Sequence, residues 1–98
     1  MLAFTSGDPS GIGPECAAAA LRRVSRFCRP LLVGEASVWR RAGWKGGQAE
    51  LCDTGLDLKP PAFGRTTKEG GAASFAAVEA AVRLAREGRV NGLVTGPI

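Results

Sequence analysis

The sequence predicts an α/β fold in which helices cover both faces of a parallel β-sheet, an α/β/α arrangement. Short apolar runs of strand length alternate along the 98 residues with segments of helical periodicity, in the order β-α-β-α-β-loop-α-β. This alternation is typical of parallel sheets whose strands are joined by right-handed crossovers. The run at residues 30–34 supports this class, because a strand that is covered on both faces is apolar without alternation.

The chain opens with a predicted strand, a glycine-rich loop and a helix. Residues 2–6 form an apolar run that stops at Gly7, and the loop extends to Gly13. We place Gly13 near the N-cap and Pro14 at the first helical position, where the fixed φ of proline suits a helix. The helix extends to residue 27. Its predicted inward stripe is Ala17, Ala20, Leu21, Val24 and Phe27 (or Cys28).

The middle of the chain predicts two strands around a short helix. The strand at 30–34 is followed by a helix at 36–42, with Val38 and Trp39 inward and Gly43 at its end. A turn at 46–47 leads to a weaker strand at 49–53. Residues 54–68 then form a long connector, and connectors of this length are often functional or belong to a larger structure.

The last helix and strand complete the alternation. The helix carries an apolar stripe at i, i+3, i+7 and i+10, and an exposed charge ladder at i, i+4 spacing. The stripe, which Ala81 and Leu84 flank, is Phe75, Val78, Val82 and Ala85. The ladder is Glu79, Arg83 and Glu87. Gly88 is the expected C′ residue, and a strand at 92–95 ends at Gly96.

Composition excludes several classes of function. The net charge is +4, but the basic residues are scattered and are not interleaved with aromatic ones, so we expect no nucleic-acid partner. No apolar run approaches the roughly 20 residues of a membrane span, and none resembles a signal peptide, so we expect no membrane partner and a cytoplasmic location. The chain has an odd number of cysteines, which are Cys16, Cys28 and Cys52. We expect them to be reduced and to act as small core residues. The absence of histidine excludes a histidine metal site and a Ser-His-Asp triad.

Two strand ends carry candidate ligand-binding loops, and both would line one crevice if their strands are neighbours. The first has the spacing Gly7, Gly11, Gly13, which is neither the dinucleotide fingerprint nor a P-loop. Asp8 in this loop would repel phosphate. It could instead accept hydrogen bonds from a sugar hydroxyl, an ammonium group or the loop's own amides, or simply stabilise the turn.

Two further candidates have equally plain structural interpretations. Thr95 follows the last strand, and its hydroxyl either faces a ligand or is buried and satisfied within the fold. The run at 66–71 opens the last helix, and its amides either hold an anion or form an ordinary helix cap.

Residues 7–15, Gly-Asp-Pro-Ser-Gly-Ile-Gly-Pro-Glu, closely resemble the opening motif of the 4-hydroxythreonine-4-phosphate dehydrogenases of vitamin B6 biosynthesis. The Gly-Gly…Ser-Phe helix and the following Val-Thr-Gly-Pro-Ile at 94–98 resemble the family's next block. This resemblance implies a fold like that of the isocitrate and isopropylmalate dehydrogenases. It implies oxidation and decarboxylation of a phosphorylated hydroxy amino acid, with NAD (or NADP) and a divalent metal (Zn, Mg or Co). It also implies a homodimer with active sites between subunits.

The resemblance carries over to few residues of this chain. The family's metal ligands are histidines, which this chain lacks, so we expect no catalytic residue or metal ligand here. The positions that carry over as lining of a cofactor or substrate pocket are Gly7, Asp8, Pro9, Ser10, Gly11, Gly13, Thr95, Gly96 and Pro97.

The same resemblance sets the expected extent and activity of the chain. We expect residues 1–98 to be an N-terminal part of an α/β dehydrogenase, without a complete second domain, inactive and cofactor-free on its own. One alternative is a dehydrogenase of threonate or erythronate phosphate. Another is a non-catalytic binding or dimerisation module.

Overall fold

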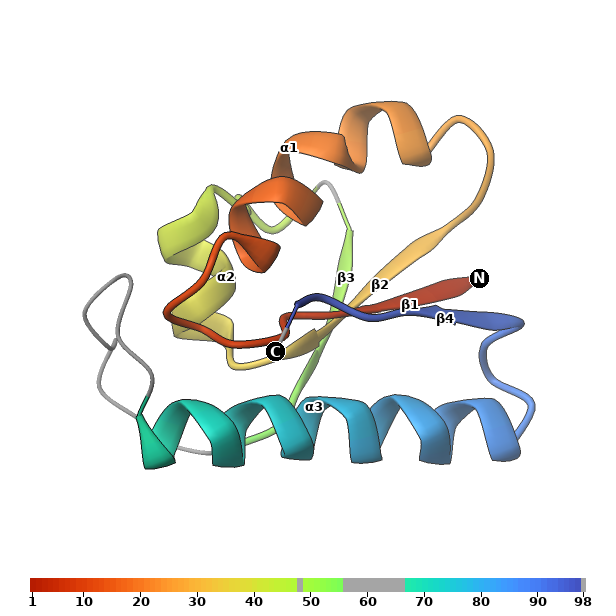
Figure 1. Ribbon diagram of the computed structural model, residues 1–98. Coiled ribbons are helices and arrows are strands. Elements are labelled where there is room, and N and C mark those ends of the chain that lie inside the picture. Colours follow the sequence, from red (N-terminus) through yellow and green to blue (C-terminus); the bar gives the residue numbers. More distant parts are fainter. Residues whose placement is uncertain (48, 56–66, 98) are drawn as a thin grey trace.

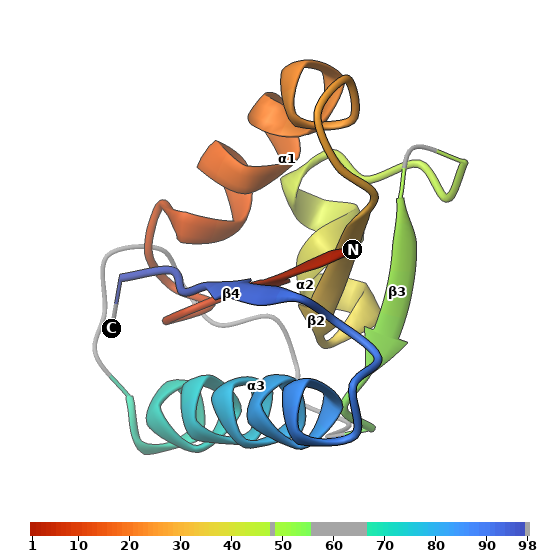
Figure 2. The same ribbon diagram turned by 90° about the vertical axis from the view of Figure 1, so that its right-hand side faces the viewer.

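The computed structural model describes residues 1–47, 49–55 and 67–97, which form a parallel sheet between two layers of helices. The strands are β1 (Leu2–Thr5), β2 (Pro30–Gly34), β3 (Glu50–Asp53) and β4 (Gly92–Val94). The helices are α1 (Gly13–Val24), α2 (Ala36–Ala42) and α3 (Lys68–Arg86). α1 and α2 lie on one face of the sheet and α3 on the other (Figure 1, Figure 2). The predicted α/β class and element order are confirmed.

The strand order is β3-β2-β1-β4, and the strands pair in parallel. β1 therefore lies between β2 and β4, and Ala3 is level with Leu31 on one side and Leu93 on the other. The chain moves outward from β1 to β3 and then returns through α3 to the opposite side of β1. Such a reversal opens a crevice outside the carboxyl ends of the two strands where it occurs, here β1 and β4.

Two apolar clusters fill the spaces between the sheet and the helices. The cluster on the α3 side contains Ala3, Leu31, Val33, Ala77, Ala81, Leu84 and Val90. The cluster on the other side contains Phe4, Leu21, Leu32 and Trp39, from β1, α1, β2 and α2. Successive strand residues thus face opposite layers, which explains why β2 is apolar and buried at every position.

α1 differs from its prediction at both ends. Its N-cap is Ile12, so Gly13 lies inside the helix and Pro14 follows within the first turn. The helix ends at Val24, and Phe27 is 88% exposed in the turn that follows, so its predicted inward position was wrong. Pro30 disfavours helical geometry at the residue before it, and the chain must leave the helix in time to enter β2.

α3 buries a different face from the one predicted. Its buried residues are Gly70, Ala73, Ser74, Ala77, Ala81 and Leu84. Phe75 is 68% exposed and Val82 is also exposed, so their predicted inward positions were wrong. The flanking Ala81 and Leu84 are buried, and Ala85 of the predicted stripe packs against the cluster on the α3 side. Small side chains let the helix axis approach the sheet closely, and this close approach displaces the larger residues outward. The predicted charge ladder is exposed, with Glu79 and Arg83 paired at 3.8 Å.

The smaller expectations mostly agree with the structure. α2 has the predicted bounds, and Gly43 ends it with a φ of 115°. Gly88 has a φ of 75° at the C′ position of α3. β3 begins at Glu50 and β4 ends at Val94, each one residue inside its predicted range. Of the predicted connector, residues 56–66 lie outside the described residues.

Candidate functional site

Hydrogen bonds join the loop after β1 to the loop after β4. The backbone N–H of Asp8 donates to the carbonyl of Pro97 at 2.8 Å. The N–H of Gly96 donates to Oγ1 of Thr5, whose side chain is buried at the end of β1, at 3.2 Å. The two predicted loops therefore form one structural unit at the topological reversal of the sheet.

Glycines allow this close contact. A Cβ on Gly7 would overlap the carbonyl oxygen of Pro97 and lie 2.7 Å from the carbonyl carbon of Gly96, and Gly7 has a φ of 66°. A Cβ on Gly13 or on Gly96 would lie 2.8 Å from the carbonyl oxygen of Ser6. The glycine spacing thus serves loop-to-loop packing, and positions 7, 13 and 96 leave no room for a side chain.

Asp8 stabilises the first loop by accepting hydrogen bonds from backbone N–H groups of the same loop. Its Oδ1 accepts a hydrogen bond from the N–H of Ser10 at 2.9 Å, and its carbonyl accepts one from Gly11 at 2.9 Å. These bonds confirm the turn-stabilising interpretation of Asp8. A direct contact with a ligand stays a prediction for this carboxylate.

The first turn of α3 lies against Asp8. A Cβ on Gly70 would be 3.0 Å from Oδ1 of Asp8, and the N–H of Gly70 donates to Oγ1 of Thr67 at 2.9 Å. The ordinary cap proposed for this run is therefore confirmed. A carboxylate this close to the helix N-terminus also disfavours a phosphate there, because two anions would share one site.

A cavity of about 270 Å³ lies over β1 and β4 on the α1 side. Four predicted site residues line it: Gly13, Thr95, Gly96 and Pro97. The other predicted positions, Gly7, Asp8, Pro9, Ser10 and Gly11, do not line it. The remaining lining residues were not predicted as site residues; they are Phe4, Thr5, Ile12, Cys16, Ala17, Ala20 and Val94.

Two of the lining residues correct expectations made from the sequence. Thr95 is exposed, so its alternative interpretation as a buried hydroxyl is wrong. Cys16 is exposed on α1, so it is not a core residue. Thr5 had a usable signal, since a threonine stands at or near the end of each predicted strand that leads into a candidate loop. The apolar lining residues had no such signal, because residues of these types are equally common in a hydrophobic core.

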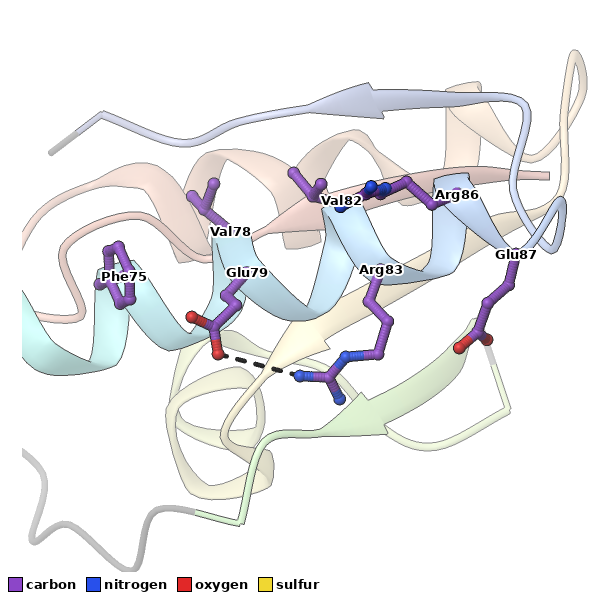
Figure 3. A pocket seen from close by; sticks show the side chains of 7 residues that line it. All are labelled: Phe75, Val78, Glu79, Val82, Arg83, Arg86 and Glu87. Carbon is purple, nitrogen blue, oxygen red and sulfur yellow. Dashed lines mark ion pairs between the residues drawn. The ribbon is translucent and has the colours of Figure 1, made fainter.

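The lining chemistry suits binding better than proton transfer. The walls combine apolar side chains with backbone groups, two threonine residues and Cys16, and the described residues contribute no carboxylate, lysine or arginine to them. The volume lies just below the roughly 300–1,000 Å³ typical of ligand pockets, so it would hold part of a dinucleotide or substrate. A larger groove of about 560 Å³ lies on the outer face of α3 and contains no predicted site residue (Figure 3).

The described residues do not fit a metal ion. Within 1–47, 49–55 and 67–97, no three carboxylate or thiol residues come together as ligands, and the chain has no histidine. Over the same residues, no helix combines the length and the apolar character needed to cross a membrane.

No protein-family model matches the sequence. Curated relatives nevertheless match it along its whole length. It is 33% identical over 120 residues to a Symbiobacterium thermophilum protein provisionally named D-threonate 4-phosphate dehydrogenase, covering 100% of this chain and 36% of that one. It is 33% identical over 119 residues to the 4-hydroxythreonine-4-phosphate dehydrogenase of Desulfosudis oleivorans, covering 100% and 35%. The chain thus spans about a third of the length of these relatives.

Solved structures give the same relationship. The crystal structure of a 4-hydroxythreonine-4-phosphate dehydrogenase from Burkholderia phymatum superposes with a TM-score of 0.81 and 26% identity, over 96% of this chain and 35% of that one. A terephthalate 1,2-cis-dihydrodiol dehydrogenase from Burkholderia xenovorans superposes with a TM-score of 0.74 and 29% identity, over 94% and 32%. In sequence and in fold, the chain is therefore similar to about one third of proteins named 4-hydroxythreonine-4-phosphate dehydrogenase and D-threonate 4-phosphate dehydrogenase.

Proposed function

We propose that these residues are part of a nicotinamide-dependent dehydrogenase that oxidises and decarboxylates 4-phosphohydroxy-L-threonine. The observation that carries the proposal is the match of the whole chain to such enzymes, together with the interlocked loops at its two matching motifs. The family resemblance further supports a divalent metal, a cytoplasmic homodimer and a phosphorylated small-molecule substrate, without a nucleic-acid or membrane partner.

The role of this chain in the reaction is to bind and orient. When bound, NAD would accept the hydride from the carbon that bears the hydroxyl, and the resulting β-keto acid would then lose carbon dioxide. Thr5 and Gly7 hold the loop at 95–97 in place, and this loop walls the cavity. The exposed Thr95 hydroxyl and the backbone groups beside it are the polar atoms available for orienting a ligand.

D-threonate 4-phosphate is the second candidate substrate. Relatives with this name match the chain as completely as those named for 4-hydroxythreonine 4-phosphate, including one from Cupriavidus necator at 28% identity over 119 residues. The two substrates differ at C2, where one carries an ammonium group and the other a hydroxyl. Erythronate 4-phosphate, which shares the C2 hydroxyl, is the third phosphate to compare.

The test is a substrate panel on the complete polypeptide that carries these residues. With NAD and a divalent metal, we expect NADH formation from 4-phosphohydroxy-L-threonine at a higher kcat/KM than from D-threonate or erythronate 4-phosphate. The reverse order would establish the second candidate. No turnover of any of the three would leave the non-catalytic binding module as the better explanation.

The 98 residues alone provide a second assay. We expect them to form no NADH under the same conditions, because they contain no histidine and their described part holds no metal-ligand cluster.

A further inference from the structure

Positive charge is concentrated in the layer of α1 and α2. Counting side chains only, residues 13–50 contain seven basic residues and three carboxylates, a formal charge of +4. The other described residues contain four basic and five acidic ones, a formal charge of −1. The seven basic residues are exposed and lie on α1, on α2 or in the segments that lead from these helices into β2 and β3. They are Arg22, Arg23, Arg26, Arg29, Arg40, Arg41 and Lys45, and we call them the basic surface.

The carboxylates of this layer stand mostly apart from that charge. Glu15 lies in the first turn of α1, at the opposite end of the helix from its basic last turn. Glu35 is buried at the N-cap of α2. Glu50 pairs with Arg29 at 2.8 Å. Positive and negative side chains are therefore segregated within the layer.

Helix geometry accounts for some of the basic positions but not for all of them. Arg22 and Arg23 lie in the last turn of α1, where the helix dipole favours a cation. Arg26 and Lys45 lie beyond the ends of α1 and α2, and neither has a carboxylate within ion-pair distance among the described residues. Exposed like charges repel one another and lower the stability of a fold. A surface that keeps them suits a partner of opposite charge.

The segments that enter β2 and β3 lie side by side. β2 pairs in parallel with β3, and Leu31 is level with Glu50, so both strands begin at the same edge of the sheet. A hollow of about 330 Å³ lies between the two segments. Ser25, Cys28 and Arg29 line it from the first segment, and Gly46, Gly47 and Ala49 line it from the second. Arg26 and Lys45, each adjacent in sequence to a lining residue, therefore stand beside the same hollow.

An exposed aromatic side chain stands among the basic ones. Phe27 is 88% exposed, and its turn is ordered, because its N–H donates to the carbonyl of Val24 at 2.9 Å. Of the other aromatic residues in the layer, Trp39 is buried, and the guanidinium of Arg40 lies over the ring of Trp44 at 5.8 Å. The layer thus offers one aromatic ring to a partner.

We propose that the basic surface binds an acidic segment of a partner protein, with an apolar side chain of that segment packed on Phe27. Six of the seven basic residues are arginines, whose planar guanidinium groups bind carboxylates through two parallel hydrogen bonds. Single-stranded nucleic acid would need several aromatic rings for stacking, and an anionic membrane several apolar side chains for insertion. Between positions 13 and 47, Phe27 is the one exposed large apolar residue. A single ring therefore favours a peptide over either alternative.

α1 keeps the basic surface apart from the cavity of the candidate site. Its first turn lines the cavity through Gly13 and Cys16, whereas its last turn carries Arg22 and Arg23. The 12 residues of the helix span about 18 Å. A partner on the basic surface would leave the cavity open, whatever reaction the complete polypeptide catalyses.

Binding of synthetic probes to the complete polypeptide tests the proposal. The probes are decaglutamate, a peptide of the same charge with a leucine at its centre, and decathymidylate, all followed by fluorescence anisotropy. Phosphatidylglycerol vesicles are tested by co-sedimentation. At low salt we expect the leucine peptide to bind in the micromolar range and about fivefold more tightly than decaglutamate, because the leucine covers Phe27. If neither peptide binds, or if the thymidylate or the vesicles bind more tightly, the proposal is wrong.

Charge-reversal variants locate the binding. Arg22→Glu combined with Arg26→Glu should weaken the binding of both peptides about tenfold or more. Phe27→Ser should remove the advantage of the leucine peptide and leave the binding of decaglutamate unchanged. The matched control is Arg86→Glu combined with Arg89→Glu, at exposed positions in and after α3 on the other side of the sheet (Figure 1). Equal losses in the two double variants would show a response to net charge alone and would overturn the proposal.

Hydrogen exchange of the unaltered polypeptide provides a test that needs no substitution. The leucine peptide should slow the exchange of backbone amides at 22–29 and 43–47 and leave those of α3 unchanged. Slower exchange confined to other segments would contradict the proposal. None of these measurements depends on turnover, so their failure would leave the proposed function intact.

Discussion

Gly7 is the residue on which the packing of the two loops most depends. It combines a φ of 66° with backbone contacts to Gly96 and Pro97 that leave no space for a Cβ. Gly88 has a similar φ of 75° but no atom within 4 Å of its would-be Cβ. The two positions therefore separate the conformational cost of a side chain from the steric cost.

We expect Gly7→Ala to lower the free energy of unfolding by about 3 kcal/mol or more, since conformational strain and a backbone clash add together. Gly88→Ala, the matched control, should cost only about 1–2 kcal/mol. Urea titrations of both variants measure the difference. Equal losses would show that the loops can separate at little cost.

Ser10 provides a residue-scale test of structure against function. Its hydroxyl is buried and has no hydrogen-bond partner among the described residues. Removing an unsatisfied buried hydroxyl should leave stability unchanged or raise it by up to about 1 kcal/mol. We expect this result for Ser10→Ala in urea unfolding. A loss above about 1 kcal/mol would mean that the hydroxyl is bonded.

Ser74→Ala is the matched control, because its hydroxyl is also buried and unpaired among the described residues, but it lies within α3. If the Ser10 hydroxyl contacts substrate in the complete enzyme, Ser10→Ala should raise KM while Ser74→Ala leaves it unchanged. An unchanged KM in both would remove Ser10 from the predicted binding residues.

At the scale of elements, α3 shows why helical periodicity alone did not identify the buried face. Two stripes share the period of the helix, and the predicted one contains the large side chains of Phe75 and Val82. The structure instead buries Ala77 and Ala81 against β1 and β2. Which stripe is buried depends on the distance between the helix and the sheet, and the periodicity of a single segment carries no information about that distance.

We expect Ala81→Leu to destabilise the fold by about 1–3 kcal/mol, because Ala81 is completely buried and the extra volume would push α3 off the sheet. Phe75→Ala should change stability by no more than about 0.5 kcal/mol, since this side chain is mostly exposed. Thermal or urea unfolding of the two variants measures which substitution costs more stability. A larger loss for Phe75→Ala than for Ala81→Leu would show that the stripe with Phe75 is the buried one.

At the scale of the whole molecule, the order of the elements was predictable and the extent of the site was not. Alternating strand and helix patterns give a parallel sheet, and the glycine and proline signals located both loops that meet at its carboxyl edge. The return of β4 to the free side of β1 made those loops neighbours, and no residue pattern specifies that return. The apolar cavity wall was also missed, because Ile12 and Ala20 look like ordinary core residues until the exposed face of α1 is known.

This incomplete wall leads to a prediction about the isolated 98 residues. Among the residues that the structure describes, none with a charged side chain lines the cavity and none belongs to a metal-ligand cluster. These residues therefore offer no charged partner there to the phosphates of NAD or to a divalent ion. A ligand raises the midpoint of thermal unfolding appreciably only if its concentration approaches or exceeds its dissociation constant for the folded state. We therefore expect millimolar NAD with Mg²⁺ or Zn²⁺ to shift the midpoint of the 98 residues by less than about 1 °C. In the complete polypeptide, the same additions should raise the midpoint by several degrees, because the other walls of the site are present. A rise of several degrees in the isolated chain would mean that its two loops form a nucleotide site without further polypeptide.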